Sequence, residues 1–414
     1  MKKLVALLLA LTLCIGLCAC GATAEKPAEE TPATTGETET PATDAKDIKV
    51  GFIFLHDENS TYDLNFINAA KAAAAELGLS DDQIMMKTNI AESQACYDAA
   101  AELVDAGCDL VITDSFGHES FALAAAKEFP EVQFVSCTGV KAHTEGLSNF
   151  HNAFASIYEG RYLAGVAAGL KLNEMIENGD ITAEEAKMGY VGAYPYAEVK
   201  SGYTSFFLGA RSICPSVTME VTFTSSWYDE ALEKEAANKL INNGCVLISQ
   251  HADSMGAPTA CETAGVPNVS YNGSTVAACP NTFIVSSRID WTPFFVYAIN
   301  CVASGEDIGY DWTGTLATGS VVLTEVNEQA AAAGTVEKIA EVMKALEDGS
   351  VKVFDTATFT VNGETVTTYL ADVDDLGDYV GETEVISDGM FLESFYRSAP
   401  YFDLDIDGIT NLDA

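Results

Sequence analysis

Polar and aromatic side chains recur in the loops that follow the apolar segments of this sequence. In several of these loops an aromatic ring lies beside an amide, a carboxylate or an imidazole, as at 62–65 and 227–229. An aromatic face stacks on a flat ring, and the polar neighbour binds the edge of that ring through hydrogen bonds. The combination therefore predicts a site for a flat polar ring. The candidate ligand-binding residues are Tyr62, Asp63, Asn65, Ser115, Phe116, His118, Tyr194, Trp227, His251, Asp253, Asn272 and Trp291.

Some of these residues have an equally simple structural interpretation. Asp63 and Asn65, and also Asp229 in the loop of Trp227, have side chains that cap helix N-termini and lie where predicted helices begin. The rings of Tyr194, Tyr196 and Trp227 could instead pack one lobe of the chain against another. Both interpretations remain open at the level of sequence.

Motifs of metal centres and of catalysis are missing from the sequence. His118, His251, Asp114 and Asp253 could together bind a metal such as zinc, but their spacing is not that of a known metal motif, and a polar lining is the simpler interpretation. The sequence has no GxSxG elbow, no GxxxxGK[ST] loop, no HExxH and no GxGxxG after its first predicted strand. We therefore predict a binding protein without a cofactor or a metal, and not an enzyme.

Two patterns alternate between these loops. Apolar runs such as 48–55, 109–113 and 245–249 predict buried strands, and the Ala-rich stretches between them have helical periodicity. Parallel strands joined by helices form a sheet that helices cover on both faces. The alternation begins again after a helix predicted at 158–172, which indicates two similar lobes. Ligands bind at the carboxyl ends of such strands, where the loops described above lie.

We therefore predict an α/β chain with two lobes, each a doubly wound and mostly parallel sheet. Residues 48–150 with about 284–320 form the predicted N-terminal lobe, and 151–283 with about 321–354 form the predicted C-terminal lobe. Residues 355–414 follow as a hairpin and tail. Asn362 and Gly363 between alternating β-formers predict the hairpin. The aromatic residues of 390–402 are expected to pack the tail against a lobe.

The charge balance excludes several classes of partner. The 414 residues include 21 Lys and Arg against 61 Asp and Glu, a formal net charge of −40. Such a polyanion is repelled by the phosphates of nucleic acids and by anionic lipid headgroups. We therefore expect no nucleic-acid partner and no membrane binding through basic residues.

Residues 1–19 have the pattern of a bacterial lipoprotein signal peptide. Lys2 and Lys3 precede an apolar run at 4–17, which is too short to span a membrane. The following residues, LCACG, resemble the lipobox, so Cys20 is the predicted lipidated residue; an ordinary signal peptide beside a cysteine is the alternative. Residues 20–47 are rich in Thr, Glu, Pro and Ala and predict a disordered tether. The predicted link to the cell membrane is this lipid anchor alone.

The cysteines give little further information. The sequence has 11, of which three lie in the predicted signal and anchor, and the remaining eight include no CxxC pair. Several of the eight lie in strand-like apolar runs, where free buried thiols are common. We expect mostly free thiols, although an even number in an exported protein also permits disulfides.

Three stretches of the sequence resemble the basic membrane protein family of lipoproteins, the substrate-binding subunits of ABC importers, among which purine-nucleoside receptors are the best-known branch. The stretches are NFHNAFASIYEGRYLAGVAAG, SSWYDEALEKEAANKLINNG and SQHADS, and the resemblance extends from about 48 to 354. In the first stretch, Gly160, Ala164 and Gly165 are expected to allow close helix packing. Glu159 and Arg161 are expected to face outward or toward the hinge.

The resemblance implies a type I periplasmic-binding-protein-like fold whose two lobes are joined by a hinge of several strands. It also implies a monomeric receptor outside the cytoplasm that closes on a small ligand and delivers it to an ABC permease and ATPase. No reaction on the ligand is required for this function. A receptor with the same fold that serves a signalling partner, or one that binds zinc, is the alternative.

Departures from the family pattern bear on the ligand. In nucleoside-binding members of the family the first loop has a sequence similar to Asp-Asp-x-Ser-Phe-Asn. This chain has Thr-Tyr-Asp-Leu-Asn at 61–65 instead, which keeps the Asn and shifts the aromatic residue. Their Gly-x-Asp-x-Asp loop appears as 270–274 without either carboxylate, and their lysine aligns with Ile289 or Arg288. Those groups hold ribose hydroxyls in the family. A purine-like nucleobase is therefore the expected ligand, with a nucleoside bound through other groups, or another small polar metabolite, as the alternative.

Overall fold

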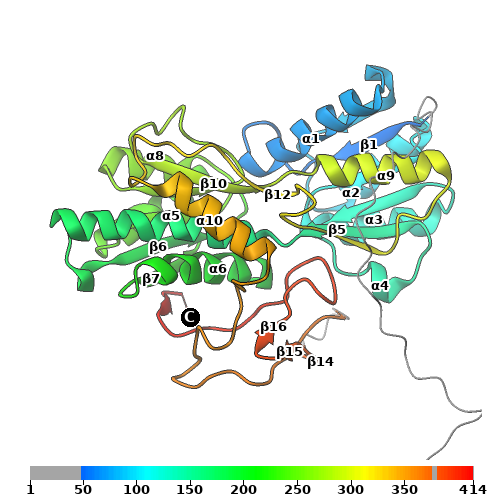
Figure 1. Cartoon of the computed structure of the whole chain (residues 1–414). Helices are drawn as coiled ribbons and strands as arrows, with labels where there is room; N and C mark the ends of the chain where they lie inside the picture. The colour runs from blue at the N-terminus through cyan, green and yellow to red at the C-terminus, as the bar shows by residue number, and fades with distance from the viewer. Residues whose placement is uncertain (1–47, 375–379, 414) are drawn as a thin grey trace, which may run out of the picture. The chain divides into compact units, whose positions relative to one another are not determined.

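The computed structural model describes residues 48–374 and 380–413. The predicted signal peptide, Cys20 and the tether lie outside the described residues. Within the described ranges no helix has the length and apolar character that crossing a membrane requires. The described chain forms two sheets of mainly parallel strands, each covered by helices (Figure 1).

The first sheet contains six parallel strands in the order β11-β5-β4-β3-β1-β2. They are β1 (Val50–Ile53), β2 (Ile84–Lys87), β3 (Leu110–Thr113), β4 (Gln133–Cys137), β5 (Phe150–Ala155) and β11 (Asp311–Gly314). Its helices are α1 (Thr61–Leu77), α2 (Gln94–Asp105), α3 (Glu119–Glu128), α4 (Ala142–Glu145) and α9 (Thr292–Ser304), with short 3₁₀ turns η1 (Asp81–Gln83) and η2 (Phe116–His118). Helices α1 and α9 share one apolar core with the sheet, and α2 and α3 share another. The sheet is therefore covered on both faces, as the alternation predicts.

The second sheet contains seven strands in the order β12-β10-β9-β8-β6-β7-β17, all parallel except β12. They are β6 (Lys187–Gly192), β7 (Thr218–Phe223), β8 (Leu247–His251), β9 (Asn268–Tyr271), β10 (Phe283–Ile289), β12 (Val321–Leu323) and β17 (Ile409–Asn411). Its helices are α5 (Ile157–Asn178), α6 (Ala197–Ile213), α7 (Glu230–Asn242), α8 (Gly256–Ala264) and α10 (Thr335–Glu347), with the turn η3 (Ala183–Glu185). Two apolar cores again lie on opposite faces, one with α5 and α6 and one with α7 and α8.

Helices α5 and α6 approach each other so closely that their backbones touch. A Cβ added at Gly165 would lie 2.0 Å from the carbonyl oxygen of Phe206, and one at Gly209 would lie 2.0 Å from that of Tyr162. Only glycine fits at such a distance. The close packing predicted at Gly165 is confirmed.

The outward position expected for Arg161 is wrong, because its side chain is fully buried in the second lobe. The guanidinium donates hydrogen bonds of 2.9 Å to the hydroxyls of Tyr190 and Ser249, and the rings of Tyr190, Phe206 and Tyr271 surround it at 5.0–5.4 Å. Hydroxyl dipoles and aromatic faces stabilise a cation that helical periodicity alone would place in solvent. Glu159 does lie toward the hinge, where it accepts a hydrogen bond from the backbone N–H of Leu316.

The chain crosses between the two sheets three times. Strand β5 belongs to the first sheet and β10 to the second, so the crossings follow Ala155 and Ile289, and a third lies between Gly314 and Val321. The sequence boundaries at 150 and 283 therefore assign β5 and β10 to the wrong lobe, whereas the boundary at 320 falls within the third crossing. A strand pattern does not reveal which sheet the strand joins, and this is the reason for the difference.

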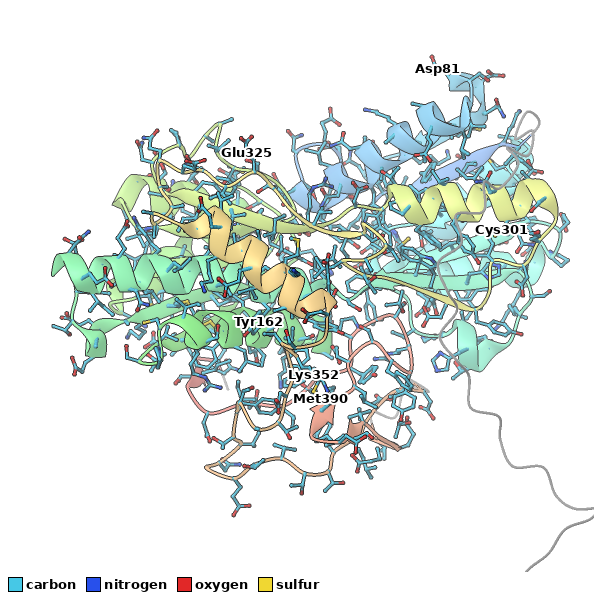
Figure 2. All side chains as sticks on the ribbon, viewed as in Figure 1. Asp81, Tyr162, Cys301, Glu325, Lys352 and Met390 are labelled. Atoms are coloured by element: carbon cyan, nitrogen blue, oxygen red, sulfur yellow. The ribbon has the colours of Figure 1, made fainter. Side chains whose placement is uncertain are left out.

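The segment from 355 onward, hereafter the tail, is mostly irregular. It contains β13 (Leu370–Ala371), β14 (Thr383–Glu384), β15 (Ile386–Ser387) and β16 (Met390–Phe391), and it ends with β17 beside β7. The expected hairpin is reduced to one bridge between Val361 and Glu364 around the Asn362–Gly363 turn, whose φ values are 53° and 81°. The expected aromatic packing is confirmed, since Phe391 and Phe402 are buried in the core of the second lobe. Figure 2 labels Met390, the first residue of β16, in this part of the chain.

All eight cysteines in the described ranges are buried and free, as expected. Burial raises the pKa of the Cys96 and Cys245 thiols to about 12 and that of the Cys108 thiol to about 11. These thiols are therefore protonated at neutral pH.

Candidate functional site

The carboxyl ends of the two sets of parallel strands meet at a small pocket, hereafter the inner pocket. Its volume is about 20 Å³, room for about one water molecule. The residues that line it come from both lobes: Leu55, Tyr62, Ser115, Phe116 and Thr138 from the first, and Glu198, Trp227, His251, Asp253 and Tyr271 from the second. A ring can enter only when the lobes separate or these side chains move.

On the side of the first lobe, the start of α1 positions Tyr62. Ser60 caps the helix by accepting a hydrogen bond from the backbone N–H of Asp63, and the hydroxyl of Tyr62 donates to the carbonyl oxygen of Asp114 at 2.6 Å. Burial raises the pKa of Asp114 well above its usual range, and the Asp63 charge raises it further. Burial also favours a higher pKa for Asp63, but hydrogen bonds from His56, Asp114 and Ser60 hold it below its usual value. Asp63 therefore carries the negative charge of this pair and Asp114 the proton.

On the side of the second lobe, β8 and its following loop position an imidazole and a carboxyl. The His251 ring lies 4.4 Å from the Tyr271 ring, and its Nε2 lies 3.4 Å from Oε1 of Glu198. Burial lowers the pKa of His251 although Glu198 opposes this effect, and burial raises the pKa of Asp253 well above its usual range. Both groups therefore favour their neutral forms, as does Tyr62, whose pKa burial raises. The wall formed by these three side chains offers neutral donors and acceptors.

The two lobes touch across the pocket. The backbone N–H of Thr61 donates to the carbonyl oxygen of Asp253 at 3.0 Å, and the side-chain amide of Asn65 donates to Oδ1 of Asn272 at 3.3 Å. The rings of Phe116 and Tyr196, from opposite lobes, lie 5.8 Å apart. These contacts identify Asn65 and Asn272 as partners across the cleft, outside the lining of the inner pocket.

The structure brings half of the predicted ligand-binding residues to the inner pocket. These are Tyr62, Ser115, Phe116, Trp227, His251 and Asp253. Tyr194 lies behind Trp227, edge-on at 5.1 Å, in keeping with the packing interpretation. Asp229 caps α7, whereas Asp63 and Asn65 lie inside α1 and cap nothing.

Two predicted residues lie away from the pocket. Trp291 is 1% exposed and stacks on Phe66 at 4.4 Å in the core of the first lobe. His118 is buried, its Nε2 within 2.8 Å of the carbonyl oxygen of Ile90. An aromatic or imidazole after a strand can point into the core as readily as into a cleft, and one sequence does not distinguish the two.

Four lining residues were missed by sequence reasoning. Tyr271 ends a predicted strand and Glu198 begins a predicted helix, so both lie just outside the loops that were considered. Thr138 follows β4 with a φ of 66°, and the loop after that strand was overlooked. Leu55 ends the first apolar run. Extending each loop by one or two residues in both directions would have found most of them.

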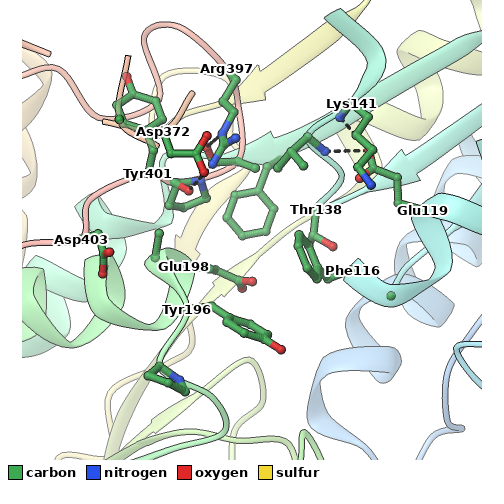
Figure 3. Close-up of a pocket in the computed structure, with 18 of the residues that line it drawn as sticks. Phe116, Glu119, Thr138, Lys141, Tyr196, Glu198, Asp372, Arg397, Tyr401 and Asp403 are labelled. Atoms are coloured by element: carbon green, nitrogen blue, oxygen red, sulfur yellow. Dashed lines mark hydrogen bonds between the residues drawn. The ribbon is translucent and has the colours of Figure 1, made fainter. Parts of the chain in front are cut away.

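A larger cavity of about 450 Å³, hereafter the outer chamber, adjoins the inner pocket (Figure 3). Phe116, Thr138 and Glu198 line both. The rest of the chamber wall comes from both lobes and from the tail.

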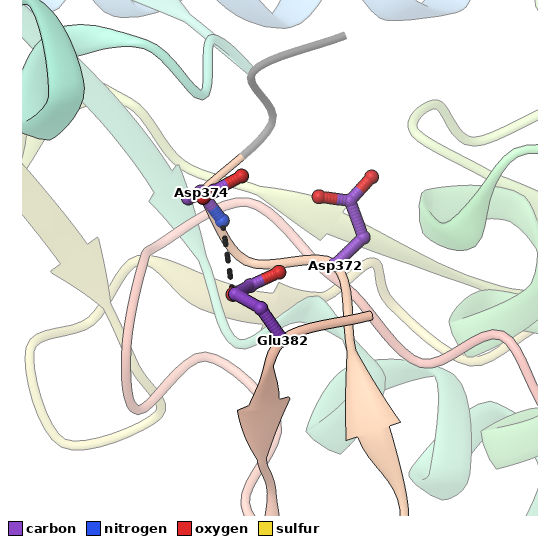
Figure 4. A group of neighbouring side chains, drawn as sticks. All are labelled: Asp372, Asp374 and Glu382. Atoms are coloured by element: carbon purple, nitrogen blue, oxygen red, sulfur yellow. Dashed lines mark hydrogen bonds between the residues drawn. The ribbon is translucent and has the colours of Figure 1, made fainter. Parts of the chain in front are cut away.

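Of the four residues considered for a metal site, His118 and Asp114 are neighbours, with Nδ1 and Oδ1 3.7 Å apart, but neither His251 nor Asp253 joins them in one group. In the described part of the chain, three carboxyl side chains of the tail lie close enough together to share an ion, namely Asp372, Asp374 and Glu382 (Figure 4). Glu382 accepts hydrogen bonds there from the backbone N–H groups of Val373 and Asp374. These bonds account for the arrangement without an ion.

A family model and individual relatives both identify proteins to which this chain is similar. The family model described as Bmp, ABC transporter substrate-binding protein PnrA-like, matches residues 53–353. A purine-binding protein of Brucella abortus is 31% identical over 261 residues, which cover 62% of this chain and 69% of that protein. A putative ABC transporter glucose-binding protein of Haloferax volcanii is 31% identical over 217 residues, 52% of each chain.

Solved structures support the fold. A solute-binding protein of an ABC transporter system from Aeropyrum pernix aligns with a TM-score of 0.61 at 18% identity, covering 74% of this chain and 93% of its own. Another from Conexibacter woesei aligns with a TM-score of 0.59 at 20% identity, covering 74% and 98%. These likenesses confirm the predicted periplasmic-binding-protein-like α/β fold. Because the family model spans most of the described residues, the chain belongs to the Bmp family of PnrA-like ABC transporter substrate-binding proteins.

Proposed function

We propose that this protein captures a purine-like nucleobase or nucleoside outside the cytoplasm and delivers it to the permease and ATPase of an ABC importer. The observation that carries the proposal is the inner pocket, in which aromatic rings from both lobes lie beside neutral polar groups. The purine-binding relative in Brucella abortus supports the same class of ligand. The receptor performs no reaction on its ligand.

The electrostatics of the pocket favour a neutral ring with polar edges. Asp253 and Tyr62 are held in their protonated forms and His251 in its neutral form, so each offers a hydrogen bond without a charge to desolvate. Phe116 and Trp227 supply aromatic faces. A heteroaromatic ring needs stacking on its faces and directional hydrogen bonds along its edge, and these residues supply both.

Lobe closure couples binding to delivery. A ligand between the lobes contacts residues of both, so it stabilises the closed state by its higher affinity for that state. The contacts between Thr61 and Asp253 and between Asn65 and Asn272 already join the lobes. The permease would recognise the closed arrangement, and opening would release the ligand. Cys20 would hold the receptor at the membrane through its lipid, and the receptor would act as a monomer.

Calorimetric titration of the purified protein tests this function. Adenine, guanine, hypoxanthine and their nucleosides are titrated separately, and glucose is included because of the haloarchaeal relative. Binding of at least one purine compound at micromolar concentration is expected. A protein that binds no purine compound at near-millimolar concentration refutes the proposed specificity, and binding of glucose alone would replace it with a sugar.

A further inference from the structure

The outer chamber has a wall that the family match does not include. Its lining from the tail includes Tyr369, Leu370, Asp372, Arg397, Tyr401 and Asp403, whereas the family model ends at residue 353. Figure 3 shows Asp372, Arg397 and Tyr401 of the tail on the opposite side of the chamber from Phe116 and Thr138. The tail is therefore placed to contact whatever extends out of the inner pocket.

The chamber and the inner pocket adjoin at shared residues. Phe116, Thr138 and Glu198 line both, and the rings of Phe116 and Tyr196 meet at the boundary. Both rings are exposed, at 40% and 45%. A ligand whose ring displaces these aromatics from each other would have its substituent in the chamber.

The chamber is large enough for such a substituent. Its volume of about 450 Å³ lies within the range of about 300–1,000 Å³ that is typical of pockets for drug-sized ligands, and the inner pocket has about 20 Å³. A bare nucleobase would leave most of the chamber to water. The volume therefore favours a ligand with a second, bulky group.

The charges of the wall determine what this group can be. Carboxyl groups of Glu198, Asp372 and Asp403 line the chamber, and carboxylates accept hydrogen bonds from hydroxyl groups. The guanidinium of Arg397 donates to the carbonyl oxygens of Val373, Ala399 and Pro400 at 3.0–3.2 Å, so it braces the tail and is not directed at a ligand. Lys141 and Arg397 also line the chamber, but the carboxyl groups of Glu119, Glu198, Asp372 and Asp403 outnumber them and the net charge of the chain is −40, so the chamber disfavours a phosphate.

The tail wall is held rigidly. Lys200 of α6 pairs with Asp403 at 2.8 Å, and β17 extends the second sheet beside β7. One backbone hydrogen bond, from Ser398 to Oδ2 of Asp311 at 2.6 Å, reaches β11 of the first lobe. These contacts of the wall are therefore mainly with the second lobe, an attachment that favours a wall formed before the ligand arrives.

From these observations we infer that the tail is part of the ligand-binding site, and that its chamber binds a neutral, hydroxyl-rich substituent on the ring, as in a glycosylated purine. This inference rests on the proposed function, because it requires the ring to lie at the inner pocket. It reverses the preference for a bare base that the lost family carboxylates indicate. The tail carboxylates stand in for the missing ones.

A substitution that fills the chamber tests the inference. Leu370 is 53% exposed and lines the chamber, so Leu370→Trp should fold and occupy part of its volume. Thr367→Trp is the matched control, because Thr367 is an exposed tail residue outside the lining. The affinities for adenosine, guanosine and inosine and for the corresponding bases are measured by calorimetry. Leu370→Trp should weaken nucleoside binding at least tenfold with base binding within twofold, and the control should change neither.

A second measurement does not depend on that variant. Hydrogen exchange of the unmodified protein should show added protection at 369–372 with a nucleoside and none with the base. An unchanged ratio of nucleoside to base affinity in Leu370→Trp, together with no added protection at 369–372, overturns the tail inference while the proposed function stands. If the unmodified protein binds neither bases nor nucleosides, the proposed function fails and the tail inference fails with it.

Discussion

Replacement of Trp227 by alanine gives the most direct test of ring binding at the inner pocket. The chain has three tryptophans, and Trp227 lines the inner pocket. Trp291 lies in the core of the first lobe, and Trp312 packs against that core. Stacking of a base on an aromatic side chain contributes about 1–3 kcal/mol. Tyr194 and Tyr196 stack on each other behind Trp227 at 5.0 Å, so one of them can partly replace the lost ring. We therefore expect the lower half of the range.

A loss of about 1–2 kcal/mol corresponds to an affinity roughly 5–30 times weaker. Calorimetry measures this loss, and tryptophan fluorescence gives an independent signal, because a purine stacked on Trp227 should quench it. Trp227→Phe should remove most of the quenching and retain most of the affinity. Trp312→Phe is the control and should leave both unchanged. If the affinity of Trp227→Ala stays within twofold of the unmodified protein, the placement of the ring at this pocket is wrong.

Three further predictions concern the cleft and the second lobe. Asn65→Ala removes the hydrogen bond to Asn272 across the lobes, so the binding free energy of the ligand should weaken by about 0.5–1.5 kcal/mol. Solution X-ray scattering should show a larger mean radius of gyration. An unchanged affinity and an unchanged radius would contradict the role of this contact. Burial raises the pKa of Glu393 to about 7, so the folded state binds its proton more tightly than the unfolded state does. Stability from this proton is present below pH 4.5 and is lost, by about 3 kcal/mol, as pH rises toward 7. Glu393→Gln should make the fall in stability between pH 5 and 8 less steep in denaturant titrations, while Glu233, whose pKa is also raised to about 7, keeps part of the slope; an unchanged slope would contradict this role of Glu393. Gly165→Ala should separate α5 from α6, cost about 1–3 kcal/mol of unfolding free energy and change the spectrum of the core. Gly179→Ala meets no neighbouring atom but has a φ of 78°, so it should cost about 1–2 kcal/mol through backbone strain alone and leave the spectrum of the core unchanged.

The alternation of apolar runs and helices was enough to predict both sheets and the region of the cleft. A parallel strand buried on both faces leaves a continuous apolar segment, and its carboxyl end is then the position of the following polar loop. For this reason Tyr62, Phe116, Trp227 and His251 could be assigned to one site without knowledge of their contacts. The sequence pattern carries this information because it is local.

The remaining differences arise from contacts between distant segments. Trp291 follows a strand as Trp227 does, but packing against the rings of Phe66, Phe154 and Phe295 directs it into the core. The assignment of β10 to a sheet, the burial of Arg161 and the course of the tail all depend on partners at least 15 residues away in the chain. No periodicity within one segment reports such partners.

The eight buried thiols of the described residues can report the local opening of this protein. They are spread over both lobes, and burial raises the pKa of seven of them, so the reactive thiolate is scarce in the folded state. A thiol reagent can therefore modify each cysteine only when its own neighbourhood opens. The modification rate of each cysteine would give the rate of local opening around it, without any engineered label. Comparison of the rates with and without ligand would show which lobe opens more often when the ligand leaves.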